Sequence, residues 1–293
     1  MILKLRKNIE NAPQEQDRAI PPWNRQRKPV QYGFSAQRRQ SASASRKALM
    51  NALNALARIV GTITLCALLI GAGLFACCLR PATSLIAQAT SNHNDSPYSQ
   101  EALVGLATLT RDYTVDGGDR AVMLDTIAQA ASDVSPALKD TSDKQAALAS
   151  LGERYTLTDD ALDHLDDVNR VIGAARIAFV VIGVACVAAL AHVLVRCGKK
   201  SFGRVLMASG GAVIALFALL TLWVVVDFNG FFAAFHSLFF SAGTWTFSYD
   251  SLLICMYPPD FWISMGILWL ATTLAGCLIC LIIGRLLIKR SAA

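Results

Sequence analysis

Four long runs of apolar residues limit what this chain can fold into. They cover residues 55–79, 171–195, 204–228 and 262–287. A helix needs about 20 apolar residues to cross the roughly 30 Å hydrocarbon core of a bilayer, and each run is that long. Acidic residues are absent from the runs, apart from Asp227 at one end. The sequence therefore predicts an all-α integral membrane protein with four transmembrane helices.

The charges between these runs predict the orientation of the helices. Residues 1–58 contain twelve Lys or Arg and three acidic residues, whereas residues 80–170 contain seven and fifteen. The 196–204 connection is basic, and residues 228–262 carry two acids and no Lys or Arg. Basic segments next to membrane helices stay in the cytoplasm. We therefore expect both termini inside, and the 80–170 and 228–262 segments outside.

These patterns divide the chain into nine expected segments. They are a disordered basic cytoplasmic tail at 1–54, a first membrane helix at 55–79, an extracytoplasmic helical loop at 80–158, a helix at 159–196 that continues into the second crossing, a cytoplasmic turn at 197–203, a third membrane helix at 204–228, an extracytoplasmic aromatic cap, re-entrant or interfacial, at 229–261, a fourth membrane helix at 262–287 and a cytoplasmic tail at 288–293.

The basic tail indicates the class of partner. Few of its residues are large and apolar, which is typical of a solvated arm. Basic residues near a membrane attract anionic lipid, so membrane lipids, including anionic ones, are the expected partners. Nucleic acid is not expected, because no recognition fold or aromatic platform accompanies the charge. The eight cysteines lie mostly within the apolar runs, so the sequence predicts no disulfide framework, and no cofactor is expected.

The cap contains the first candidate residue, His236. Residues 228–262 are rich in Phe, Trp and Tyr, whose rings favour the level of the lipid headgroups. An ionisable imidazole among such rings costs free energy unless it has a partner or a function.

The second candidate is His164, in the helix expected from Asp159. Thr158 is a suitable N-cap, and acids in the first turn suit the helix dipole. Asp160 and Asp167, at i−4 and i+3 of His164, share its face, whereas Asp166 is expected to pair with Arg170. His164 then lies about two turns outside the bilayer.

Topology brings His164 and His236 together. A short cytoplasmic hairpin joins the second and third membrane helices, so their outer ends should lie side by side. Two histidines and an acid define no single chemistry. They would suit structural hydrogen bonding, a general base, a proton relay, or a metal site formed by His164, Asp167 and His236.

Several motifs add a family resemblance that covers about residues 55–287. They are Tyr155-Thr156, Ala161-Leu162-Asp163-His164-Leu165-Asp166-Asp167-Val168, Phe235-His236-Ser237-Leu238-Phe239-Phe240, Gly243-Thr244-Trp245-Thr246-Phe247, Asp250-Ser251-Leu252-Leu253-Ile254 and Pro259-Asp260-Phe261-Trp262. In order, spacing and membrane side they resemble the signatures of the Lit-type integral membrane family, the lipoprotein intramolecular transacylases and their relatives.

The resemblance implies an acyltransferase of a bacterial plasma membrane, with its site on the outer face. Such enzymes move the sn-2 acyl chain of a diacylglyceryl-modified lipoprotein cysteine onto that residue's α-amino group. The resemblance implies His164 and His236 as catalytic residues and Asp167 as an orienting acid. For Tyr155, Trp245 and Asp250 it implies substrate binding or oxyanion support.

Within that activity we expect His164 to act as the base and His236 as the donor to the oxyanion, since Asp167 lies one helical turn from His164. A non-enzymatic lipid-binding or assembly protein, and the metal site, remain alternatives.

Overall fold

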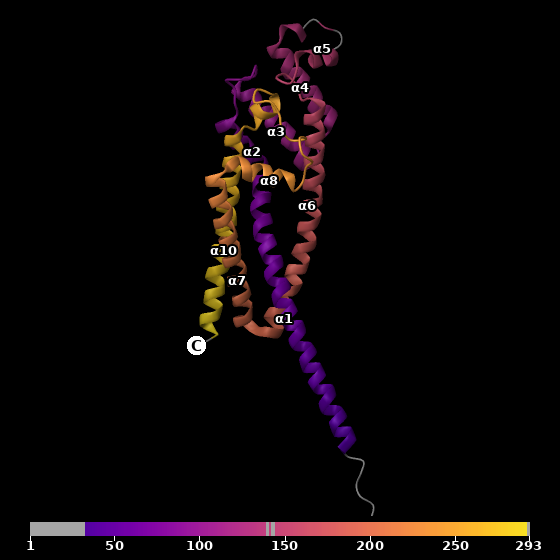
Figure 1. Ribbon diagram of the computed structural model, residues 1–293, viewed down its shortest axis with the longest axis vertical. Coiled ribbons are helices and arrows are strands. Elements are labelled where there is room, and N and C mark those ends of the chain that lie inside the picture. Colours follow the sequence, from indigo (N-terminus) through magenta and orange to yellow (C-terminus); the bar gives the residue numbers. More distant parts are fainter. Residues whose placement is uncertain (1–32, 139–140, 142–143, 292–293) are drawn as a thin grey trace, which may run out of the picture. The chain divides into compact units, whose positions relative to one another are not determined.

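The computed structural model describes residues 33–138, 141 and 144–291, which form helices joined by turns (Figure 1). The chain divides into two units, residues 1–51 and residues 52–293. Helix α1, Gly33–Cys77, begins in the first unit and continues into the second. The disordered tail expected at 1–54 is therefore wrong for residues 33–54, which are helical because Ala, Gln, Arg, Lys and Leu favour a helix. Residues 1–32 of that expected tail lie outside the described residues.

Within the described residues, three continuous helical stretches are long and apolar enough to cross a membrane: 38–77, 159–226 and 259–290. The second stretch changes direction near its middle. It consists of α6 (Asp159–His192), the π-helical segment η3 (Val193–Cys197) and α7 (Gly198–Val226). Gly198 has a φ of 81°, which a glycine adopts without strain. Helix α7 then runs back in the direction opposite to α6 (Figure 1).

Large apolar side chains cover the outward faces of these stretches. On α6 the exposed residues include Ile177, Val180, Val184 and Val187, and α10 (Pro259–Arg290) exposes Ile267 and Ile282. Such a surface is far more apolar than water-facing helices tolerate, whereas lipid tails solvate it well. The exposure of these side chains thus agrees with a membrane-integral helical protein.

Glycines let α7 and α10 pack closely. A Cβ atom on Gly203 would lie 2.7 Å from the carbonyl oxygen of Gly284, and one on Gly284 would lie 2.7 Å from the carbonyl oxygen of Gly203. Farther along, a Cβ on Gly210 would lie 2.9 Å from the carbonyl oxygen of Cys277. Small residues at such crossings are the usual means of association between helices in lipid.

A leucine at this crossing should destabilise the fold. We expect Gly284→Leu to push α10 away from α7 and to lower the free energy of unfolding by about 1–3 kcal/mol, the usual cost of overpacking. Gly266 lies on the same helix with open space around its Cβ position, so Gly266→Leu is the matched control. Thermal unfolding in detergent micelles measures both. Equal midpoints for the two variants would show that the crossing contributes no stability.

The remaining helices form a compact group beside one end of the membrane-length helices. They are α2 (Arg80–Thr90), α3 (Gln100–Asp116), α4 (Arg120–Val134), η2 (Pro136–Leu138), α5 (Lys144–Leu151), α8 (Phe228–Ser237) and α9 (Leu252–Met256). The side chain of Ser99 caps α3 and that of Asp119 caps α4. Apart from α8, these helices share a core that includes Leu103, Met123, Ile127, Leu165, Leu252 and Met256, and that core thus takes in the first turns of α6.

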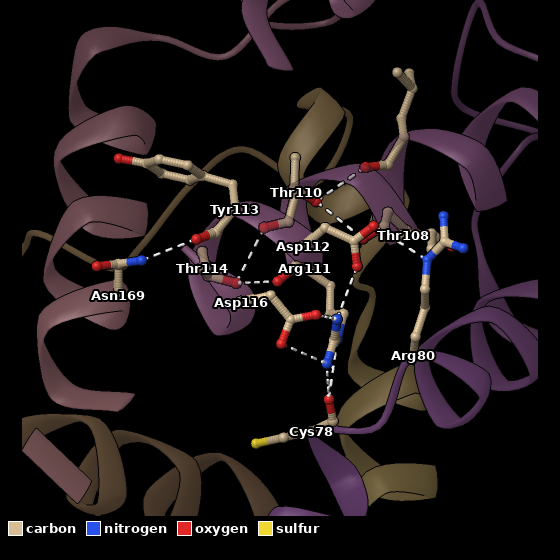
Figure 2. A network of polar contacts seen from close by, with 12 residues as sticks. Cys78, Arg80, Thr108, Thr110, Arg111, Asp112, Tyr113, Thr114, Asp116 and Asn169 are labelled. Carbon is tan, nitrogen blue, oxygen red and sulfur yellow. Dashed lines mark hydrogen bonds and ion pairs between the residues drawn. The ribbon is translucent and has the colours of Figure 1, made fainter. Parts of the chain in front are cut away.

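A polar network ties the end of α1 to α3 and α6 (Figure 2). The buried Arg111 of α3 donates from Nε to the carbonyl oxygen of Cys78 over 2.9 Å and pairs with Asp112 over 2.7 Å and with Asp116. Asp116 also pairs with Arg176 of α6 over 3.2 Å. The network fixes α6 against α3.

Asp166 takes part in a second link between these elements. We expected it to pair with Arg170, and that expectation is wrong. Its carboxylate instead accepts from the hydroxyl of Tyr113 on α3 and pairs with Arg120 of α4 over 3.3 Å. Nδ2 of Asn169 donates to the carbonyl oxygen of Tyr113 over 2.8 Å. Packing of α3 against α6 thus offers Asp166 partners that its own helix does not.

Candidate active site

Two helices position the histidines. Helix α6 begins at Asp159, after Thr158, whose side chain accepts from the backbone N–H of Ala161 over 3.3 Å. Helix α8 is capped by Asp227, whose carboxylate accepts from the N–H of Gly230 over 2.8 Å. In Figure 1, α8 lies across the space between α7 and α6. His164 is in the second turn of α6, outside the apolar run that begins at residue 171.

The structure brings His164 and His236 together, as the hairpin topology predicts. Their ring centroids lie 6.4 Å apart and their planes differ by 26°. Groups that act on one reaction centre must lie within hydrogen-bond reach of it or one water away. The spacing of the two imidazoles allows both to contact one small polar group.

Aromatic rings enclose both imidazoles. The ring centroid of His164 lies 4.8 Å from that of Phe240 and 5.8 Å from that of Phe247. The ring of His236 lies 4.0 Å from Phe232 and 4.9 Å from Trp245. These rings limit the water around the pair, so electrostatic interactions within the site are stronger than they would be at an open surface.

His236 is held in one tautomer. It is buried, and its Nδ1 lies 2.9 Å from the carbonyl oxygen of Phe232. A carbonyl oxygen only accepts, so Nδ1 carries the hydrogen and Nε2 of the neutral ring is an acceptor. Burial lowers the pKa of His236, and the bond to Phe232 partly opposes this. A neutral ring with a free Nε2 fits a base, whereas we expected His236 to donate to the oxyanion.

His164 has a buried nitrogen without a partner. Its Nδ1 is shielded from solvent and makes no hydrogen bond among the described residues. The pKa of His164 is lowered to about 4, chiefly by burial and also by the neighbouring His236, while the charge of Asp167 opposes this shift. His164 is therefore neutral at physiological pH, and an unpaired buried nitrogen is a costly arrangement that a bound substrate would relieve.

Trp245 has the same property. Its Nε1 is buried and has no hydrogen-bond partner among the described residues. An indole N–H only donates, so a ligand atom that pairs with it must be an acceptor. Next to the imidazole of His236, this donor suits the oxygen of a carbonyl or of an oxyanion.

Asp167 pairs with Arg170 in this structure. Among the described residues, its carboxylate accepts no hydrogen bond from His164, although its charge acts on the pKa of that ring. In the sequence, Asp167 lies one helical turn from both His164 and Arg170. Spacing alone therefore does not decide which of the two its carboxylate contacts.

Tyr155 and Asp250 support the segment that carries Trp245 and Phe247. The carbonyl oxygen of Tyr155 accepts from the hydroxyl of Tyr98 over 2.6 Å, and its side chain packs on the outer core. Asp250 pairs with Arg154 over 3.5 Å, next to the bond from the N–H of Leu252 to the carbonyl oxygen of Glu153 over 2.8 Å. These contacts join residues 153–155 to the cap.

The donor set is not arranged for a metal ion. In the part of the chain that the structure describes, no three His, Cys, Asp or Glu side chains are grouped so that they could hold one. His164, Asp167 and His236, the residues of the alternative metal site, are not such a group among the described residues.

Two enclosing residues were not singled out from the sequence. Phe232 lies at i−4 of His236, and that spacing puts it on the same face of α8, so the sequence could have identified it. Phe240 follows the end of α8, and its N–H donates to the carbonyl oxygen of His236 over 2.9 Å. The role of Phe247 follows only from the fold of residues 238–251.

Comparison with known proteins gives a family match for the segment that carries these residues. The model of the lipoprotein intramolecular transacylase Lit family matches residues 118–262, which include His164, His236 and Trp245. A search of curated protein sequences found no match to the chain.

Solved structures share the fold. One is the membrane-integral lipoprotein intramolecular transacylase Lit from Bacillus cereus, with a TM-score of 0.60 and 14% identity over 83% of this chain and 99% of the other. A variant of the same protein with a histidine-to-alanine substitution has a TM-score of 0.50 and 15% identity over 84% of this chain and 99% of the other. The match to the lipoprotein intramolecular transacylase Lit family thus covers residues 118–262, and the likeness to the solved structures is one of fold.

Proposed function

We propose that this protein is a membrane acyltransferase that moves the sn-2 acyl chain of a diacylglyceryl-modified lipoprotein onto the α-amino group of its N-terminal cysteine. The observation that carries the proposal is the neutral histidine pair, 6.4 Å apart, within the segment that matches the family model. The buried unpartnered atoms Nδ1 of His164 and Nε1 of Trp245 give an ester two groups to contact.

His236 acts as the base in this proposal. An α-amino group has a pKa near 8, so most of it is protonated at neutral pH and a base must accept a proton before the amine can attack. Nε2 of His236 accepts that proton, and the carbonyl oxygen of Phe232 supports the resulting imidazolium through Nδ1–H. The amine then forms the new C–N bond at the ester carbonyl.

His164 and Trp245 support the oxyanion in this proposal. A neutral imidazole and an indole can each donate an N–H to the oxygen that becomes negative in the tetrahedral intermediate. The nitrogen of that intermediate then loses its second proton to water. When the intermediate collapses, the C–O bond to the glycerol breaks, and the departing oxygen takes a proton from the imidazolium of His236. The products are an amide and a free sn-2 hydroxyl. Asp167 acts on His164 through its charge. The contacts of Tyr155 and Asp250 stabilise the cap.

In the decisive experiment, the protein is expressed in bacterial cells whose lipoproteins are diacylglyceryl-modified. The N-terminal peptides of those lipoproteins are then analysed by mass spectrometry. N-acyl, monoacylglyceryl peptides are expected. If the protein accumulates folded in the membrane and no such peptide forms, transacylation is wrong, and the lipid-binding or assembly alternative takes its place.

The proposal includes four membrane crossings, with the site on the outer face of a bacterial plasma membrane. The turn at Gly198 supports separate crossings by α6 and α7, and Lys199, Lys200 and Arg204 next to it are exposed and basic. The excess of acids in 80–170 supports an outer location for α2 to α5.

Cysteine labelling tests this topology. In a background without the eight native cysteines, Ser237→Cys should react with a membrane-impermeant thiol reagent in intact cells. Lys200→Cys, in the turn at the opposite end of α7, should react only after the cells are opened. The reverse pattern would place the histidines inside and overturn the proposal for an outer site.

The basic part of α1 supports contact with anionic lipid. Arg38, Arg39, Arg46 and Lys47 are exposed on the helix that precedes the first apolar run. Each basic residue near an anionic surface contributes about 1 kcal/mol of attraction.

A further inference from the structure

Asp167 has two possible partners on its own helix. It lies three residues after His164 and three residues before Arg170, and side chains with that spacing are neighbours on a helix surface. In the structure its Oδ1 accepts from Nη2 of Arg170. Among the described residues, the Nδ1 atom of His164 has no hydrogen-bond partner.

From this arrangement we infer that Arg170 is a positioning residue, which holds the carboxylate of Asp167 away from the imidazole of His164 and so leaves Nδ1 of that ring free for the substrate. The inference rests on the proposed function and adds a residue to it. Without Arg170, the carboxylate would have one charged neighbour fewer and would turn toward His164, the ring on which its charge already acts.

The surroundings of His164 leave few other groups to set its charge. His236 faces it from α8, and Asp167 lies on its own helix. Asp166 is engaged by Tyr113 and Arg120, and Asp250 of the 238–251 segment by Arg154. Asp160 and Asp163, the other acids near it on α6, are exposed.

A neutral His164 matters for the proposed reaction because His236, whose ring centroid lies 6.4 Å from that of His164, must take up a proton. A charged His164 would oppose that uptake, just as His236 lowers the pKa of His164 in the substrate-free site. Arg170 would therefore extend the active range of the enzyme toward lower pH.

The pair itself contributes little to the fold. The side chain of Arg170 is 75% exposed and that of Asp167 33% exposed, and exposed pairs are weak. Substitution of Arg170 should thus change the site without unfolding the protein, and the thermal midpoint checks this.

The test is a histidine titration of the full-length protein, labelled with ¹⁵N-histidine, in detergent micelles. The chain has four histidines, and His164→Gln identifies the signal of His164. We expect Arg170→Gln to raise the pKa of His164 by about one unit, the lower end of the effect of a close opposite charge. Arg170→Lys should keep most of the wild-type value.

A double variant separates positioning from a general effect of the lost charge. In Arg170→Gln combined with Asp167→Asn, the pKa of His164 should fall back to that of Asp167→Asn alone. The acid limb of the pH–rate profile should move upward by the same amount in Arg170→Gln. An unchanged pKa in Arg170→Gln, or a rise that persists in the double variant, overturns the inference.

The titration needs no substrate, so its outcome is independent of the proposed activity. A shifted pKa in a protein without transacylase activity would leave the positioning role intact and remove only the proposed reaction. An unshifted pKa in an active enzyme would remove only the role of Arg170.

Discussion

His164→Ala and His236→Ala should each lower the formation of N-acyl product by about 10²-fold or more, since loss of a single base or oxyanion donor commonly costs that much. His236→Ala removes the proton acceptor. His164→Ala removes one of the two proposed donors to the oxyanion and leaves only Trp245. Mass spectrometry of lipoprotein N-terminal peptides, normalised to the amount of folded protein, measures both losses.

His93→Ala and His192→Ala are the matched controls and should keep most of the activity. His93 is exposed in the turn before α3, and Nε2 of His192 lies 2.9 Å from Oδ1 of Asn54, away from the pair. His236→Asn tests the base more sharply, because its amide can still donate to the carbonyl oxygen of Phe232 but has no Nε2 lone pair. Full activity in His236→Asn would exclude His236 as the base.

Trp245→Phe should lower kcat by about 10²-fold with little change in KM, because the indole N–H is needed most when the oxyanion forms. Phenylalanine keeps an aromatic ring beside His236, where the centroids now lie 4.9 Å apart, and removes only the donor and part of the ring area. Steady-state rates of acyl transfer, measured over a range of concentrations of a synthetic diacylglyceryl lipopeptide, give kcat and KM separately.

Trp262→Phe is the corresponding control. Nε1 of Trp262 donates to the carbonyl oxygen of Tyr257 over 3.1 Å, so this variant loses a structural hydrogen bond and no free donor. It should keep a near-normal kcat even if its thermal midpoint falls. If both tryptophan variants lose kcat equally, general packing of the cap explains the effect and Trp245 has no special part in it.

The sequence by itself determined the helical membrane architecture and where the histidines would meet. Apolar runs of helical length need lipid around them, a requirement that is local along the chain and therefore visible in one dimension. Thr158 and the acids after it predict the start of α6, which the structure places at Asp159. The juxtaposition of His164 and His236 followed from topology, because a short hairpin has few ways to fold.

Only the tertiary structure decided what each side chain contacts. Asp166 turns to Tyr113 and Arg120, which lie more than forty residues away in sequence and reach it through the packing of α3 and α4 against α6. The tautomer of His236 depends on the direction of one backbone carbonyl group, and the unpartnered Nε1 of Trp245 depends on the fold of the cap. A hydrophobicity pattern carries no information on such choices, because competing partners differ by only a kcal/mol or so and are set by distances of an ångström or less.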